Sequence, residues 1–187
     1  KRVEKYKSLI HIKIGFFIFL FLSLLSAGLL AQIIKHIVGR PRPNHTNLNE
    51  NIGFDFFNLS SNFHSFPSGH TATIFAVALT IVFFLPKTKY FILSFASLVA
   101  FSRVVVGAHF FTDVVGGIVV AYLGVKLTKI ILDRYSFVKV EKTKKDINRL
   151  LKNNFHYVRI YYGCFFLFLL VVLVSIAPSI DIYLSGL

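Results

Sequence analysis

The stretch IGFFIFLFLSLLSAGLLAQII, residues 14–34, decides the fold of this chain. It runs for roughly 21 residues without a charge, and a helix that rises about 1.5 Å per residue carries such a segment across the roughly 30 Å hydrocarbon core of a bilayer. Similar apolar segments follow at residues 71–85, 90–106, 114–132 and 160–177. The predicted fold class is therefore all-α, a polytopic transmembrane helix bundle with about five spans.

The composition also indicates a membrane protein. Of the 187 residues, 55% are hydrophobic and the mean hydropathy is +0.68, which excludes an ordinary soluble domain. The net charge of +13 is typical of nucleic-acid-binding proteins as well. Here, however, the basic residues lie between the apolar segments and do not alternate with aromatic residues, as a base-stacking surface requires. We expect the bilayer as a partner and no nucleic acid.

The chain divides into three parts. Residues 1–135 hold the first four apolar segments and form the predicted transmembrane core. Residues 136–159 form a basic segment, in which KKDINRLLKNNF (144–155) has the amphipathic pattern of a helix on a bilayer surface. Residues 160–187 carry the last apolar segment, predicted to be an additional transmembrane helix. Because the chain has no methionine, even at its first position, we expect further helices upstream of the core.

Three polar runs stand at the ends of the apolar segments: KHIVGRPRP at 35–43, PSGH at 67–70 and SRVVVGAHFFTD at 102–113. Because consecutive spans alternate in direction, all three runs fall on the same face of the membrane. The opposite face receives the PKTK turn (86–89) and the Lys/Arg-rich stretch at 133–159, so the positive-inside rule makes that face cytoplasmic. We therefore expect an integral protein of the plasma (bacterial inner) membrane with its polar runs on the extracytoplasmic, periplasmic face.

Taken singly, the residues of the first two runs have ordinary structural explanations. Lys35, Arg40 and Arg42 can be anchors that reach from a helix end to the membrane interface. Ser68 can simply cap the helix that follows it. The functional alternative is that Ser68, the N–H group of Gly69 and the N-terminus of that helix bind an anion together.

The third run pairs His109 with Asp113, four residues apart and hence on one face of a helix turn. The carboxylate can accept the ring N–H of the histidine and leave the other nitrogen as a nucleophile or base; the structural alternative is a helix-entry histidine with a capping acid. The guanidinium of Arg103 suits phosphate oxygens, and His70 is placed to protonate a leaving group. A cluster of cations around one carboxylate is costly unless an anion such as phosphate fills it.

In this order, the three runs resemble the signature of the type 2 phosphatidic acid phosphatase family, whose superfamily includes the bacterial class A acid phosphatases and the vanadium haloperoxidases. The pattern is K-x6-R-P, P-S-G-H and S-R-x5-H-x3-D, and every position of it is present. The resemblance implies a bacterial membrane phosphatase that hydrolyses a lipid phosphate or lipid pyrophosphate through a phosphohistidine intermediate, without a metal or another cofactor.

The resemblance also implies the role of each residue. His109 would attack phosphorus, Asp113 would orient its ring, and His70 would protonate the leaving oxygen and then activate water. The phosphate oxygens would be bound by Lys35, Arg42, Ser68, Gly69 and Arg103. Arg40 is outside the signature, and we interpret it as a secondary contact to the headgroup or the membrane.

Two other functions stay open. The same intermediate would serve a lipid phosphotransferase, and a basic vestibule would suit an anion transporter, although transporters carry ionisable groups near the bilayer midplane. Candidate substrates are undecaprenyl pyrophosphate, lipid A phosphate, phosphatidylglycerophosphate and phosphatidic acid. The family core has six helices, so two spans are expected before Lys1, and the segment at 160–187 departs from that pattern. With its basic lead-in it resembles the first helix of some lipid A phosphatases.

Overall fold

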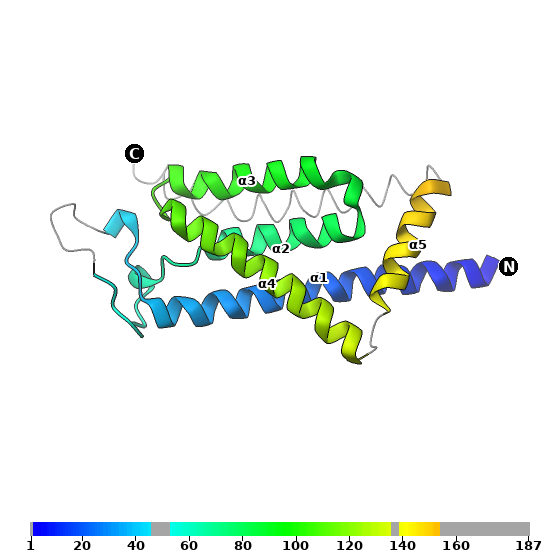
Figure 1. The fold of residues 1–187 in the computed structure, drawn as a ribbon, viewed down its shortest axis with the longest axis horizontal. Coiled ribbons are helices and arrows are strands. Elements are labelled where there is room, and N and C mark those ends of the chain that lie inside the picture. The colour runs from blue at the N-terminus through cyan, green and yellow to red at the C-terminus, as the bar shows by residue number, and fades with distance from the viewer. Residues whose placement is uncertain (1, 46–52, 136–138, 154–187) are drawn as a thin grey trace.

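The computed structural model describes residues 2–45, 53–135 and 139–153, and in these ranges every regular element is helical. The α-helices, labelled in Figure 1, are α1 (Arg2–Val38), α2 (Gly69–Phe84), α3 (Lys89–Val105), α4 (Phe111–Tyr135) and α5 (Val140–Asn153). Short 3-10 turns, η1 (Pro43–His45), η2 (Ser61–Phe63) and η3 (Pro86–Thr88), lie between them. The all-α prediction is confirmed for this part of the chain.

Three of the described helices are long and apolar enough to cross a membrane, namely Ile10–Val38, Pro86–Val105 and Phe111–Tyr135. The apolar helix α2 is shorter, with 16 residues, and it begins inside the PSGH run at Gly69. The predicted number of about five spans is thus only partly confirmed. The segment predicted to span at 160–177 lies outside the described residues.

The ends of the helices follow from local sequence. Helix α1 stops at Val38 because Gly39 adopts a left-handed backbone conformation (φ 54°), which glycine tolerates, and donates its N–H to the carbonyl of Lys35 at 3.1 Å. Helix α2 starts after Ser68, whose hydroxyl accepts the N–H of Thr71 at 3.4 Å. The polar runs therefore mark helix ends, as their sequences predict.

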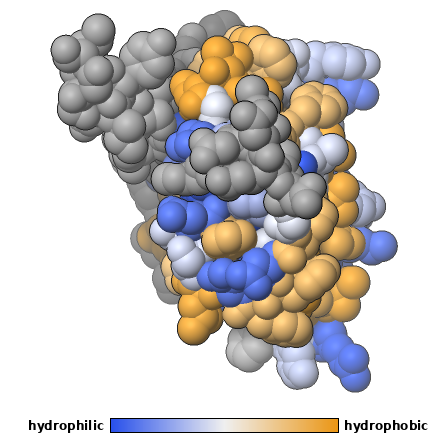
Figure 2. Space-filling model, turned by 90° about the vertical axis from the view of Figure 1, so that its left-hand side faces the viewer, coloured by the Kyte–Doolittle hydropathy of each residue, from blue (hydrophilic) through white to orange (hydrophobic). Residues whose placement is uncertain are grey.

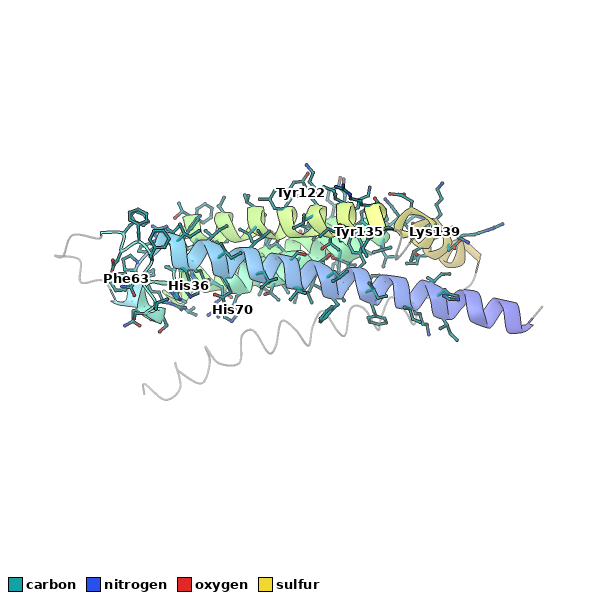
Figure 3. All side chains as sticks on the ribbon, turned by 90° about the horizontal axis from the view of Figure 1, so that it is seen from below. His36, Phe63, His70, Tyr122, Tyr135 and Lys139 are labelled. Carbon is teal, nitrogen blue, oxygen red and sulfur yellow. The ribbon has the colours of Figure 1, made fainter. Side chains whose placement is uncertain are left out.

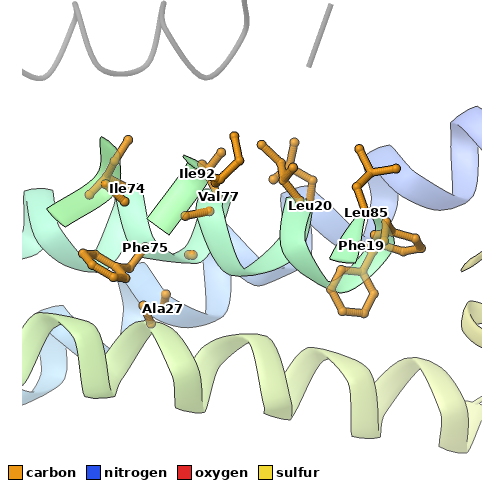
Figure 4. Close-up of a cluster of buried hydrophobic side chains, with 14 of the residues drawn as sticks. Phe19, Leu20, Ala27, Ile74, Phe75, Val77, Leu85 and Ile92 are labelled. Carbon is orange, nitrogen blue, oxygen red and sulfur yellow. The ribbon is translucent and has the colours of Figure 1, made fainter. Parts of the chain in front are cut away.

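The core lies where α1, α2, α3 and α4 pack together (Figure 4). Phe19 and Phe84 are fully buried, with ring centroids 5.3 Å apart in an edge-to-face arrangement. Helices α1 and α4 approach closely at Gly124, where an added Cβ would lie 2.7 Å from the backbone nitrogen of Ala27. This close approach fixes the position of α1, which leads into the first polar run, against α4, which begins in the third.

Large apolar side chains on the outside of α1 recur at helical spacing, as on a surface that faces lipid. Phe17, Phe21, Leu25, Leu29 and Ile33 are between 45% and 64% exposed. Such a continuous apolar stripe would be costly in water and is what a membrane span presents to acyl chains. The stripe ends level with the first polar run.

The helix in the basic segment, α5, packs across the other end of the bundle (Figure 1). Val140 is fully buried, the side-chain amide of Asn148 donates to the carbonyl of Phe84 at 3.2 Å, and the Lys144 ammonium lies 4.4 Å from the ring centroid of Phe83. The segment predicted at 144–155 is therefore helical as far as Asn153, and its Ile147 packs against the core of the bundle.

Candidate active site

The three polar runs meet at one end of the bundle. Helices α1 and α3 end there, and α2 and α4 begin there (Figure 1). Figure 3 shows His36 and His70 at this end, and Tyr135 and Lys139 at the opposite end. Viewed from this side, hydrophilic side chains form patches between hydrophobic ones (Figure 2). The alternation of spans thus brings together residues far apart in sequence, as predicted.

Lys35 connects the first run to the second. Its side chain is buried in the last turn of α1, and its ammonium donates to the carbonyl of His64 at 3.1 Å. A Cβ added to Gly69 would lie 3.6 Å from the same Nζ atom, so the ammonium lies beside the N-terminus of α2. A cation and free helical N–H groups at one place are a suitable site for an anion.

Ser68 is fully buried at this N-terminus. Its hydroxyl oxygen accepts hydrogen bonds from the N–H and from the hydroxyl of Thr71, the latter at 3.0 Å, and its own N–H donates to the carbonyl of Asp113 at 2.9 Å. The capping role and the anion-binding role of Ser68 are therefore compatible, since its O–H proton is left to donate to a ligand. The bond to Asp113 ties the second run directly to the third.

A tight turn between α3 and α4 holds Arg103 and His109 together. Gly107 adopts a left-handed conformation (φ 67°), and the N–H groups of Ala108 and His109 both donate to the carbonyl of Arg103 at 3.2 Å. The side chains of Arg103 and His109 are both buried. The six-residue spacing between them is thus set by one compact helix-to-helix turn.

Asp113 is fully buried in the first turn of α4, and both of its carboxylate oxygens are occupied. Oδ2 accepts hydrogen bonds from the hydroxyl of Ser65 at 2.6 Å and from the N–H of Phe110 at 2.9 Å, and Oδ1 accepts one from Arg40 at 2.7 Å. The bond to Phe110 is half of a capping box, because Phe110 directly precedes α4 and the side chain of its third residue, Asp113, accepts the N–H of Phe110. Helix capping therefore fixes the carboxylate beside His109.

The ring of His109 faces this carboxylate through Nδ1, which lies 3.6 Å from Oδ2 of Asp113. Burial lowers the pKa of His109, the interaction with Asp113 raises it, and the charges of Lys35 and Arg42 lower it; the net direction is downward. The lowered pKa favours the neutral imidazole. At 3.6 Å the Nδ1 atom makes no hydrogen bond to Oδ2, but the carboxylate favours the tautomer with the proton on Nδ1, which leaves the lone pair on Nε2, as a nucleophile requires.

The remaining residues of the predicted site surround this pair. Electrostatic interactions couple His70 to Arg103, His109, Lys35 and Arg42. The backbone N–H of Arg42 donates to the carbonyl of Asn62 at 3.0 Å, which fixes the chain between α1 and η1 against η2. The structure thus brings together all eight residues that the sequence proposed as catalytic or phosphate-binding, which are Lys35, Arg42, Ser68, Gly69, His70, Arg103, His109 and Asp113.

Arg40 makes contacts that the sequence did not indicate. Its guanidinium forms an ion pair with Asp113 and donates to the hydroxyl of Thr112 at 2.6 Å. Sequence reasoning also missed Ser65 and the carbonyl of His64. Neither a serine two residues before a proline nor a backbone acceptor forms a recognisable sequence pattern. Only their position just before the PSGH run could have indicated them.

The comparisons with known proteins agree with this geometry. The family model of the PAP2 superfamily matches residues 16–136. A lipid A 1-phosphatase of Rhizobium johnstonii is 34% identical over 116 residues, which are 62% of this chain and 48% of that protein. A lipid A 1-phosphatase of Rhizobium etli is 34% identical over 100 residues, which are 54% of this chain and 43% of that protein.

The chain spans about half the length of the curated relatives it matches, and no solved structure matches it. The family model nevertheless covers more than half of the chain and all three polar runs. The family predicted from the signature is confirmed, and the chain belongs to the PAP2 superfamily.

Proposed function

We propose that this chain carries the catalytic core of a membrane-bound lipid phosphatase that works through a phosphohistidine at His109. The observation that carries the proposal is the buried His109, held beside the fully buried Asp113 in a site with a surplus of cations. A neutral imidazole is the attacking form, and the cations suit a phosphate dianion. The named relatives favour lipid A carrying a phosphate at position 1 as the substrate.

In the first step, Nε2 of His109 attacks phosphorus in line with the bond to the lipid oxygen. The P–N bond forms, the P–O bond breaks, and His70, which holds a proton as an imidazolium beside the bound phosphate, gives that proton to the leaving oxygen. Asp113 stabilises the positive charge that develops on the imidazole ring. The lipid alcohol leaves with that proton.

In the second step, His70 takes a proton from water, and the resulting hydroxide attacks the phosphohistidine. The P–N bond breaks, inorganic phosphate is released, and His109 returns to its neutral form. Through both steps the equatorial oxygens are bound by Lys35, Arg42, Ser68, the Gly69 N–H and Arg103. Because these groups supply the stabilising charge, we propose that the reaction needs no metal ion.

We propose that the site faces the extracytoplasmic side of the plasma membrane. The distribution of charge supports this orientation, since Lys87, Lys129, Lys142 and Arg149 lie at the opposite end of the bundle. A cysteine introduced at the exposed Ser60, with Cys164 replaced by serine, should react with a membrane-impermeant maleimide on intact cells. Reaction only after permeabilisation would reverse the orientation.

The activity is tested by measuring phosphate release from lipid A 1-phosphate, undecaprenyl pyrophosphate, phosphatidylglycerophosphate and phosphatidic acid in detergent with EDTA. We expect release from at least one of them, loss of at least 100-fold in His109→Ala, and no change in His11→Ala, which replaces an exposed histidine at the other end of α1. Activity that requires a divalent metal, or that survives in His109→Ala, would refute the mechanism. Transfer of the phosphate to an added alcohol in preference to water would identify a phosphotransferase instead.

A further inference from the structure

Arg40 stands outside the family signature, yet its side chain contacts the start of α4 directly, beside His109. Its Nη1 atom donates to Oδ1 of Asp113 at 2.7 Å and to the hydroxyl of Thr112 at 2.6 Å. Its guanidinium carbon lies 4.1 Å from the centroid of the Phe110 ring. The planar group is therefore held at the start of α4 by two hydrogen bonds and one aromatic ring.

The backbone of Arg40 is fixed as well. Arg40 and His64 form an isolated parallel β-bridge, and the carbonyl of Arg40 accepts the N–H of Ser65 at 2.9 Å. Ser65 in turn donates its hydroxyl to Oδ2 of Asp113 at 2.6 Å. The β-bridge between these two loops thus positions both side chains that donate to the Asp113 carboxylate, Arg40 to Oδ1 and Ser65 to Oδ2.

The division of the two oxygens has a physical consequence. Asp113 is fully buried, and a buried carboxylate is stable only when it is paired with a cation and its lone pairs are satisfied. Arg40 binds Oδ1, whereas Oδ2, which also accepts hydrogen bonds from Ser65 and Phe110, is the oxygen that faces the ring of His109, 3.6 Å away. A guanidinium on one oxygen also fixes the plane of the carboxylate and thereby the direction of the other oxygen.

We infer that Arg40 is a positioning residue for the His109–Asp113 pair, and that it acts through Asp113 and makes no contact with the substrate. This inference rests on the proposed function, since it concerns the nucleophile of that reaction. It differs from the sequence-based interpretation of Arg40 as a headgroup or membrane contact. The Arg40 side chain is 19% exposed and its charge is already matched by Asp113.

A double-mutant cycle tests the inference. The variants are Arg40→Gln, Asp113→Asn and the two combined, assayed for kcat/KM on the lipid phosphate that the wild type cleaves best. Loss of an orienting partner costs on the order of 10- to 100-fold, and we expect that loss for Arg40→Gln alone. In the Asp113→Asn background the same replacement should cost less than about 3-fold, because its target is gone. An undiminished loss in that background would show that Arg40 acts on the substrate and would overturn the inference.

Two further measurements separate positioning from a merely structural role. Removing the guanidinium leaves the Asp113 charge less compensated, which raises the pKa of His109, so the acidic limb of the kcat/KM profile should move to higher pH in Arg40→Gln. An unchanged limb would contradict the inference. Arg40→Lys, which keeps the charge without the planar fork, should recover part of the lost activity, whereas Thr112→Val, which removes only the neighbouring acceptor, should stay within about 3-fold of the wild type.

The failure of the proposed function would look different. A wild-type protein that releases no phosphate from any lipid phosphate overturns the proposed function, and this inference with it. An active wild type in which the losses from Arg40→Gln and Asp113→Asn simply multiply overturns only the role of Arg40.

Discussion

Replacing Gly124 by alanine should disturb the active site from the middle of the bundle. The added Cβ would lie 2.7 Å from the nitrogen and 2.8 Å from the Cα of Ala27, both backbone atoms that cannot rotate away. Ordinary contacts begin at 3.4 Å, so α1 and α4 have to separate there by about 0.7 Å. Overpacking of this kind costs about 1–3 kcal/mol, of which the better helix propensity of alanine offsets up to about 1 kcal/mol.

The displacement of α4 is transmitted to the site because Asp113 lies in the same helix, about 16 Å from Gly124 along the helix axis. Misplacement of catalytic groups by about 1 Å can cost 100-fold, so we expect a loss of at least about 10-fold in kcat/KM together with lower thermal stability. The matched control is Gly28→Ala. Gly28 lies in α1 next to Ala27, and a Cβ added to it has nothing within 4 Å. If Gly124→Ala equals Gly28→Ala in both stability and kcat/KM, the reasoning about helix separation is wrong.

Three further predictions concern other parts of the chain. His70→Asn should cleave a lipid phosphate at least about 100-fold more slowly. With an aryl phosphate, whose leaving group needs no proton, the variant should release a burst of the aryl alcohol and accumulate phosphoenzyme. Rapid steady turnover without a burst would contradict this. Phe57 is 73% exposed, and its N–H donates to the carbonyl of Ile37 at 3.4 Å, level with the end of the first span. Since the sequence has no tryptophan, the fluorescence of Phe57→Trp reports on this position alone and should be quenched by lipids with brominated acyl chains. Unquenched emission would place this loop in water. Asn148→Ala removes the hydrogen bond to Phe84 and should lower stability by about 1 kcal/mol without changing kcat/KM, because α5 lies at the end opposite the site; a loss of kcat/KM would contradict that independence.

The sequence predicts the helix ends well because each depends on local chemistry. Gly39 supplies the left-handed residue that ends α1, and Ser68 supplies the cap that begins α2. The turn predicted at PKTK is present as η3 (Pro86–Thr88). Once the ends are known, alternation of the spans places the polar runs at one end without further information. The length of α1 was underestimated, since the helix continues from the apolar segment back to Arg2 through residues that favour helix but not membrane.

The contacts that hold the site could not be predicted in the same way. Arg40 and Asp113 are 73 residues apart in sequence, and no periodicity relates a residue just after one helix to a residue in the first turn of another. Lys35 is held by a carbonyl, that of His64, which every residue type would provide. Backbone acceptors and bridges between loops do not depend on particular residue types. A sequence signature can therefore identify the reacting groups but not the contacts that orient them.

The ion pair between Arg40 and Asp113 also determines which anions the free protein attracts. The named site residues carry more positive than negative charge, since Asp113 stands against Lys35, Arg40, Arg42 and Arg103. Small oxyanions in the medium should therefore compete with the lipid, and inorganic phosphate, the product of each turnover, is one of them. Turnover should slow as phosphate accumulates, and rates measured in phosphate or sulfate buffers should be lower than those measured in chloride.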